Sequence, residues 1–355
     1  MKILASMIAL GTLAPIYAQD WNREHAAAYL DARAAWWMTW PSAARDHETF
    51  CISCHTALPY ALARPHLRTP SEATPNETKI LTNVTKRVTL WSEVEPFYTD
   101  DKQGSPKSAE SRGTESVLNA LILVSNDAPS GKLTDAAKQA FTNMWAMQWK
   151  VGETRGAWSW LNFHNQPWEA EDSQFWGATL GAIAAGSAPV EYRSAPEVKS
   201  NIDLLSEYLR RMQSEQSLLH RTAFLWASAK LPNLLDAAQK DALIKELRAQ
   251  QRPDGGWSAS SLVMKNWKRR DDTPLDPQSD GYATGLVAFA LQQVGIPRTE
   301  PGLARALDWL NKNQDATTGN WSAQSLNGKK DLASDRGKFL SDAATAYAVL
   351  ALTAK

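Results

Sequence analysis

The residues most able to do chemistry stand together in the run Cys51-Ile52-Ser53-Cys54-His55. The chain has only two cysteines, and both lie in this run. The C-x-x-C-H spacing is typical of a site where two thiols bond to the vinyl groups of one porphyrin and the histidine binds its iron. We therefore predict one haem c per chain, attached through Cys51 and Cys54, with His55 as the iron ligand.

Three other interpretations of this run stay open: a redox-active thiol pair, a simple disulfide, and half of a zinc site. Zinc would need two further ligands of suitable spacing, and no other cysteine exists. A thioredoxin-like pair would need a βαβ context, which the sequence does not show. The sixth iron position also stays open, either to a second protein ligand or to a small molecule.

Composition places the chain among ordinary globular proteins that can bury a large core. It has 355 residues, with 38 basic and 38 acidic side chains, so no charge bias points to nucleic acid as a partner. Met1, Lys2, the apolar run 3–17 and a small residue at Ala18 indicate a secretory signal peptide over residues 1–18. We expect a periplasmic or secreted protein, residues 19–355, without stable membrane insertion.

Helical patterns recur along the chain at intervals of roughly fifty to sixty residues, a period typical of repeat architectures. Each unit pairs a longer amphipathic helix with a second helix of small and apolar residues. The six predicted pairs are 22–40 with 51–66, 77–94 with 109–125, 134–149 with 172–185, 195–212 with 217–231, 236–251 with 280–294, and 301–313 with 342–353.

The second helix of each pair has almost no polar face, as in Gly177-Ala178-Thr179-Leu180-Gly181-Ala182. Such a helix must be covered on most sides, whereas an amphipathic helix needs cover on one side only. Alternation of the two kinds therefore predicts two concentric layers of helices closed into a ring. The predicted fold class is all-α, a single α6/α6 toroid of six outer and inner helix pairs.

Three of the loops between outer and inner helices share a glutamine, a glycine and a tryptophan. They run from Gln148 to Trp158, from Gln251 to Trp257, and from Gln314 to Trp321. This pattern resembles the Gln…Gly-x-Trp loop motif of the squalene-cyclase and prenyltransferase α/α-toroid superfamily. The resemblance covers most of the mature chain and implies that these loops clamp neighbouring helix ends.

The resemblance does not carry the superfamily's activities to this chain. Squalene-type cyclases use an Asp-x-Asp-Asp run to protonate an alkene, and the stretch from Asp271 to Asp276 does not match it. Prenyltransferase-type members use a zinc site built partly from cysteine, and both cysteines here belong to the C-x-x-C-H run.

Parallel inner helices would bring their first residues together around one mouth of the ring. His220, Asp172 and Asp280 are the catalytic candidates there, because a histidine and carboxylates can exchange protons with a substrate. Each also has a structural interpretation. An aspartate at a helix start is a good cap, and a buried histidine is more often simply hydrogen-bonded.

These observations predict an exported monohaem cytochrome-like protein that transfers electrons or performs redox chemistry on a small substrate at the mouth. Its partner would be a redox protein or that small molecule. Two alternatives stay open: a non-redox cyclase-like or lyase-like enzyme that uses the carboxylates, and a haem sensor or ligand-binding module.

Overall fold

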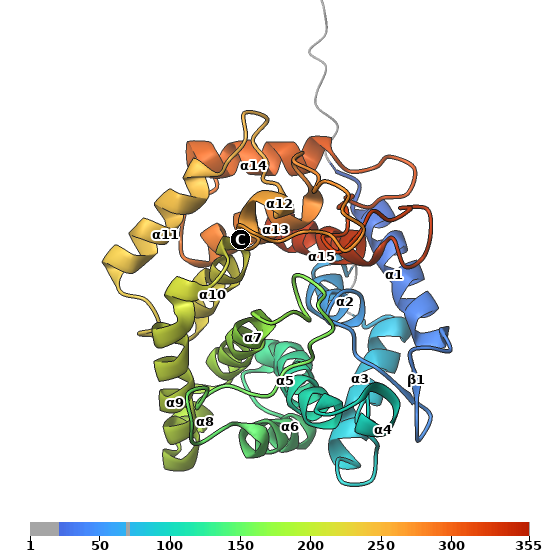
Figure 1. Cartoon of the computed structure of the whole chain (residues 1–355), viewed down its shortest axis with the longest axis vertical. Coiled ribbons are helices and arrows are strands. Elements are labelled where there is room, and N and C mark those ends of the chain that lie inside the picture. The colour runs from blue at the N-terminus through green and yellow to red at the C-terminus, as the bar shows by residue number, and fades with distance from the viewer. Residues whose placement is uncertain (1–20, 69–71, 355) are drawn as a thin grey trace, which may run out of the picture.

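The chain folds into a ring of helices, as the computed structural model shows for residues 21–68 and 72–354. Six outer helices surround six inner ones, and the chain alternates between the two layers (Figure 1). The predicted α6/α6 toroid is therefore confirmed. The predicted signal peptide, residues 1–18, lies outside the described residues.

The helix pairs of the structure match the six predicted pairs. Outer helices and their inner partners are α1 (Arg23–Thr39) with α2 (Ala57–Ala63), α3 (Pro75–Thr89) with α5 (Lys107–Asp127), α6 (Asp135–Met147) with α7 (Ser173–Ser187), α9 (Pro196–Met212) with α10 (Leu218–Lys230), α11 (Ala237–Ala249) with α13 (Gly281–Gln293), and α14 (Pro301–Lys312) with α15 (Phe339–Thr353). Three short helices lie in the connections: α4 (Asp100–Gln103), α8 (Val190–Ser194) and α12 (Ala259–Leu262).

Local sequence signals explain where the outer helices begin. Thr74 and Glu77 form a reciprocal capping box at the start of α3, and Asp236 and Gln239 do the same for α11. The inner helices need cover on nearly every side, and they receive it. In α7 and α15 most residues are buried, because each inner helix packs against its outer partner and against neighbouring inner helices.

The three glutamine–glycine–tryptophan loops make one repeated set of hydrogen bonds, which confirms that they clamp helix ends. In each loop the glutamine side chain donates to the carbonyl of the loop glycine and to a carbonyl near the start of the next outer helix. The tryptophan indole donates to a carbonyl near the end of the preceding outer helix. The glutamine donations are Gln148 to Gly156 and Asn201, Gln251 to Gly255 and Gly302, and Gln314 to Gly319 and Asn22.

The glycine of each clamp is required by its backbone and by its surroundings. Gly156, Gly255 and Gly319 have φ angles of 96°, 95° and 79°, in the region that side chains disfavour. A β-carbon on Gly319 would also lie 2.3 Å from the carbonyl oxygen of His25 in α1. The loops therefore approach the next outer helix as closely as backbone allows.

One predicted helix start is wrong by six residues, and the helix predicted over 77–94 ends five residues early, at Thr89. The first inner helix begins at Ala57, whereas we expected it to begin at Cys51. The strands β1 (Ala44–Arg45) and β2 (Thr49–Phe50) form a short hairpin, and the Cys51 amide extends it by donating to the carbonyl of Ala43 at 2.8 Å. The C-x-x-C-H run is therefore extended chain and turn that leads into α2.

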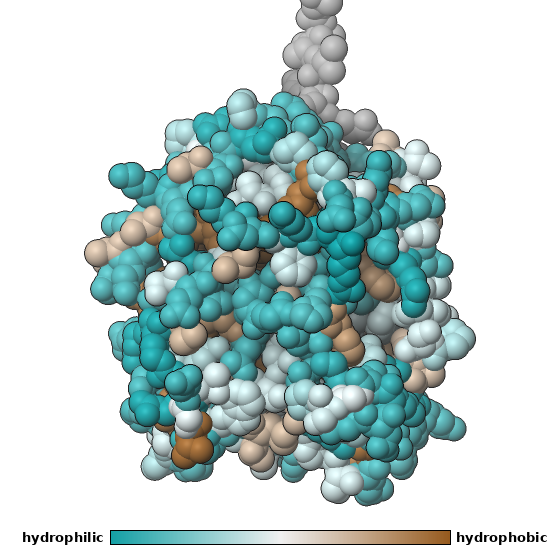
Figure 2. Space-filling view, in the orientation of Figure 1, coloured by the Kyte–Doolittle hydropathy of each residue, from teal (hydrophilic) through white to brown (hydrophobic). Residues whose placement is uncertain are grey.

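The face of the ring shown in Figure 2 is covered mostly by hydrophilic residues, with small hydrophobic areas scattered among them. Within the described part of the chain, no helix is long and apolar enough to cross a membrane.

Candidate functional site

The long loops of the third, fifth and sixth units precede inner helices α7, α13 and α15, so they meet at one end of the ring. The structure divides the predicted catalytic residues between two places there. Asp172 and His220 come together beneath the loop 163–170, and Asp280 lies in a separate cavity formed by the loops of the fifth and sixth units.

The two cysteines belong to the packed interior. Cys51 is 5% exposed and Cys54 is 4% exposed. Burial raises the pKa of the Cys51 thiol to about 12 and that of Cys54 well above its ordinary value. Both therefore stay protonated at neutral pH, which does not suit a reactive thiol pair, because the thiolate is the nucleophile.

Aromatic rings surround the imidazole of His55. The Phe339 ring stacks on it with centroids 3.8 Å apart, and Trp37 meets it edge-on at 4.9 Å. Its Nδ1 lies 2.8 Å from the Thr56 hydroxyl, and that hydroxyl donates to Asp342. The Thr56 oxygen must therefore accept from His55, which fixes the proton on Nδ1. Burial, aided by Arg33, lowers the pKa of His55 to about 3, so the ring is neutral.

Asp342 is the centre of a buried network. It is 1% exposed and accepts hydrogen bonds from Tyr29, Arg33 and Thr56 at 2.7–2.8 Å. These partners come from the first unit, whereas Asp342 lies in the first turn of α15. The Asp342 carboxylate therefore joins the last unit to the first and is not free to meet a substrate.

Asp172 and His220 form a pair in which the histidine is buried and the aspartate side chain is 15% exposed. The carbonyl of Pro167 can only accept, so the His220 Nε2 atom, 2.8 Å away, carries a proton and donates it. The His220 Nδ1 atom lies 3.5 Å from Asp172 Oδ2, and neither atom has another partner in the described residues. His220 is fully buried. These contacts support a role in positioning the loop 163–170, and a catalytic role for this pair stays a prediction.

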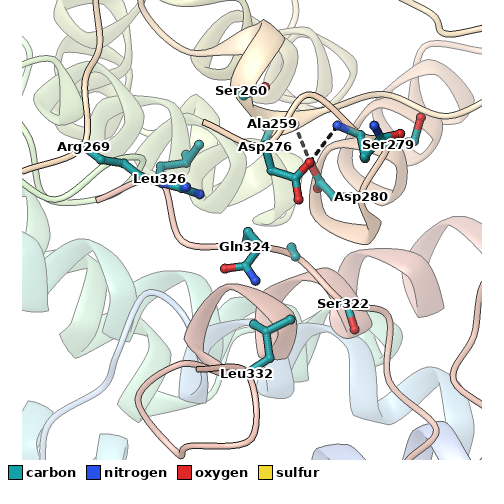
Figure 3. A pocket seen from close by; sticks show the side chains of 12 residues that line it. Ala259, Ser260, Arg269, Asp276, Ser279, Asp280, Ser322, Gln324, Leu326 and Leu332 are labelled. Carbon is teal, nitrogen blue, oxygen red and sulfur yellow. Dashed lines mark hydrogen bonds between the residues drawn. The ribbon is translucent and has the colours of Figure 1, made fainter. Parts of the chain in front are cut away.

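Asp280 does cap its helix, as the structural interpretation expects. Its Oδ1 accepts from the Ala283 amide at 2.9 Å, and its Oδ2 accepts from the Ala259 amide at 2.6 Å. It also lines a cavity of about 200 Å³ between the segments 259–280 and 322–332 (Figure 3). Burial raises the pKa of Asp280 to about 6, although its backbone hydrogen bonds oppose the shift.

A second carboxylate, missed as a candidate in the sequence, lines the same cavity. Asp276 Oδ1 accepts from the Gln278 amide at 3.0 Å, and its side chain lies near Asp280 in Figure 3. Asp276 also contributes to the raised pKa of Asp280. Its position four residues before Asp280, at the predicted start of the helix 280–294, was the signal in the sequence that could have marked Asp276 as a candidate. Gln324, three residues after Trp321, also lines the cavity, and nothing in its sequence context marked it.

Glu169 is a further titratable residue that the sequence did not single out. Burial raises its pKa to about 7, against the opposing effects of Asn165 and Lys107. It belongs to the loop 163–170, and its backbone pairs with that of Asn165. Lys107 forms an ion pair with Glu110 at 2.6 Å, and among the described residues no cation pairs directly with Glu169.

Comparison with known proteins shows a likeness of fold only. No protein-family model matches the chain, and no curated protein sequence matches it. An inactive variant of the α-1,6-mannanase GH76A of Salegentibacter sp. HEL1_6, in complex with α-1,6-mannotriose, has a TM-score of 0.53 at 12% identity. That match covers 94% of this chain and 99% of the mannanase. A glycosidase variant has a TM-score of 0.51 at 13% identity, covering 93% of this chain and 97% of its own.

The prediction of haem c is wrong. The predictions of a cytochrome-like function and of a redox partner depended on the haem, so they are wrong as well. The solved structures that share this ring are named as glycosidases, not as cytochromes. The residues also do not fit a porphyrin. Cys51 and Cys54 are packed in the core, and rings of Phe339 and Trp37 cover His55. In the described part of the chain, four cavities formed by residues 259–332, by 60–126, by 42–103, and by 23–68 with 72–74 have walls that include none of the side chains of Cys51, Cys54 and His55.

Proposed function

We propose that the chain is a non-redox acid–base enzyme of the glycosidase kind, with Asp276 and Asp280 as its paired carboxylates. The observation that carries this proposal is that both carboxylates line one cavity in unlike surroundings. Glycoside hydrolysis commonly uses two carboxyl groups, one that donates a proton to the leaving oxygen and one that activates water or attacks the sugar.

The surroundings divide these roles. Asp280 is the general acid, because burial keeps its carboxyl protonated to a higher pH than usual, with a pKa of about 6. Asp276 is exposed and accepts a backbone hydrogen bond from Gln278, so it is the carboxylate open to water and to substrate. We assign it the role of base or nucleophile, the second role that glycoside hydrolysis needs.

The fold supports a carbohydrate as substrate. The mannanase with this ring is described in complex with α-1,6-mannotriose and, in another variant, with α-1,6-mannotetrose. Its inactive variants replace two adjacent aspartates, whereas the carboxylates proposed here are four residues apart. We therefore rest the assignment on the cavity, and use the likeness only for the choice of the first substrates to test.

The repeats support a finer relationship as well. We propose that the ring is of the squalene-cyclase and prenyltransferase-like type, because three of its loops carry the Gln…Gly-x-Trp clamp with the same hydrogen bonds. This relationship concerns the scaffold. We also propose export through residues 1–18, which mass measurement of the mature N-terminus in a periplasmic fraction would test.

The test of the function is cleavage of a panel of neutral oligosaccharides, beginning with α-1,6-mannotriose, followed by mass spectrometry of the products. We expect Asp280→Asn and Asp276→Asn each to lower kcat by at least about 100-fold, the usual contribution of a positioned acid or base. Asp272→Asn is the control, because Asp272 is exposed on the neighbouring loop. Cleavage that survives both cavity variants would overturn the assignment.

A further inference from the structure

The wall of the cavity opposite the two carboxylates contains a polar side chain that has no partner. The carboxamide of Gln324 makes no hydrogen bond in the described residues, and its Oε1 atom is buried. In Figure 3 it lies between the Asp276–Asp280 pair and Leu332. A buried polar atom without a partner is costly, so one in a cavity wall is well placed to bind a ligand or an ordered water.

The backbone that carries Gln324 is held firmly on both sides. Before it, the Trp321 amide donates to Thr345 at 3.2 Å and the Ala323 amide donates to Ser341 at 3.1 Å. After it, the Ser325 carbonyl accepts two hydrogen bonds from the Arg269 guanidinium, at 2.9 and 2.7 Å. The carboxamide is therefore presented by a fixed segment, which is the condition for precise recognition.

The charges around the cavity define which ligands it would accept. Arg269 is the cationic side chain in the lining, and its three nitrogens donate to the carbonyls of Ser325 and Pro274. Three of its five N–H groups are thus engaged, and the residue is only 6% exposed, so it presents little to a carboxylate or phosphate. The carboxylate of Asp276 would repel an anion further. A neutral ligand is the one that this lining does not oppose.

The hydrogen-bonding capacity of Gln324 suits hydroxyl groups. A carboxamide offers one acceptor oxygen and an NH₂ group with two donors. Each hydroxyl on a sugar ring can donate and accept a hydrogen bond. Two neighbouring hydroxyls can therefore bond to both the oxygen and the NH₂ group of the Gln324 carboxamide. The cavity volume, about 200 Å³, is below the range of drug-sized sites and fits one small ring. Leu326 and Leu332 supply an apolar surface for the carbon framework.

We propose that Gln324 is the specificity-determining residue of this cavity and that it binds the hydroxyl groups of a neutral sugar ring, not those of a uronic acid. This rests on the proposed function, since it concerns the same cavity. It goes further by naming the substrate class and the residue that selects it.

The experiment measures binding in the Asp280→Asn background, where cleavage is blocked, by isothermal titration calorimetry. The probes are α-1,6-mannotriose and a trimer of galacturonic acid. We expect the neutral trimer to bind at least about tenfold more tightly than the acidic one, and Gln324→Leu to remove about tenfold of that affinity through two lost hydrogen bonds. Gln250→Leu is the matched control, because Gln250 is exposed and makes no side-chain hydrogen bond in the described residues.

The outcomes separate this inference from the proposed function. If Gln324→Leu folds with an unchanged circular dichroism melt and binds or cleaves sugar as before, the inference is overturned and the function stands. Tighter binding of the acidic trimer also overturns it. If neutral sugar binds in a Gln324-dependent way but the unmodified chain never cleaves it, the function fails and the inference stands. Absence of binding to both probes overturns the inference directly.

Discussion

Gln314 and Asn22 bind each other across the point where the ring closes. The Gln314 Nε2 atom donates to the Asn22 carbonyl at 2.9 Å, and its Oε1 atom accepts from the Asn22 amide at 2.6 Å. The two residues are 292 positions apart in the chain. The loop of the last unit therefore binds the start of the first outer helix. The loops of the third and fifth units bind the next outer helix through the same glutamine hydrogen bond.

This contact predicts a measurable loss of stability. Gln314→Leu removes both hydrogen bonds to Asn22 and the one to the Gly319 carbonyl. The Asn22 carbonyl keeps its bond from the Ala26 amide, but the Asn22 amide loses its protein partner, so we expect a loss of about 1–3 kcal/mol in the free energy of unfolding. Urea denaturation checks it. Gln251→Leu removes the equivalent clamp inside the ring and should cost a similar amount. A change below about 0.5 kcal/mol in Gln314→Leu would contradict the closure.

A second prediction concerns the glycine of that clamp. In Gly319→Ala the new β-carbon would meet the His25 backbone at 2.3 Å and would also sit at a φ of 79°. Gly295 has a φ of 88° but nothing within 4 Å, so Gly295→Ala isolates the conformational cost of about 1–2 kcal/mol. We expect Gly319→Ala to lower the melting temperature clearly more than Gly295→Ala. Equal shifts would show that the close approach is unimportant.

The buried ion pair between Arg33 and Asp342 supports a third prediction. Their side chains are 6% and 2% exposed, and Arg33 Nε donates to Asp342 at 2.8 Å. Arg33→Met leaves a buried carboxylate without its cation, so we expect a loss of about 3–5 kcal/mol in urea denaturation.

The double variant Arg33→Met/Asp342→Asn serves as the comparison, because it removes both charges. It should recover part of the stability that Arg33→Met loses. If the loss of unfolding free energy in the double variant equals the sum of the losses in Arg33→Met and in Asp342→Asn, the two side chains are not energetically coupled.

The fourth prediction is a pH dependence at Asp280. Its folded pKa, about 6, is raised above the ordinary value of about 3.9 for an unfolded chain. The stability it contributes is therefore fully present below about pH 4 and is lost as the pH rises through about 6. Compared with Asp280→Asn, the unmodified chain should lose roughly 2 kcal/mol between pH 4 and pH 7. Urea denaturation of both proteins at the two pH values measures the difference.

The proposed role of Asp280 as general acid also predicts a pH dependence of activity. A general acid must be protonated, so we expect kcat of the proposed hydrolysis to fall as the pH rises through about 6. A profile that keeps rising above pH 7 would exclude Asp280 as the acid. A stability difference that is independent of pH would mean that its carboxyl is not shifted.

The ring was predictable because its evidence is distributed over the whole chain. Apolar periodicity marked each of the six pairs, and the repeated glutamine, glycine and tryptophan marked the clamps. The site was less predictable, since it depends on contacts between distant segments. Cys51 and Cys54 have a local spacing typical of haem attachment, yet the β1–β2 hairpin and the packing of Phe339 on His55 decide their surroundings. No local pattern reveals such packing.

The same limit applies to the carboxylates. Asp172, Asp280 and Asp342 look alike in sequence, as acidic residues near helix starts, but they differ in the structure. Asp342 is saturated by Tyr29, Arg33 and Thr56, whereas Asp280 faces a cavity. Only the arrangement of the other helices separates a structural carboxylate from one that can meet a substrate.

Open repeat arrays have end units with only one neighbour, and such arrays can lose structure from their ends inward. The clamp between Gln314 and Asn22 gives every unit of this ring two neighbours. Unfolding then has no preferred starting point, and removal of any one helix pair would leave a gap that the remaining units cannot span. We therefore expect the array to denature in one cooperative transition, unlike a linear repeat protein of the same length.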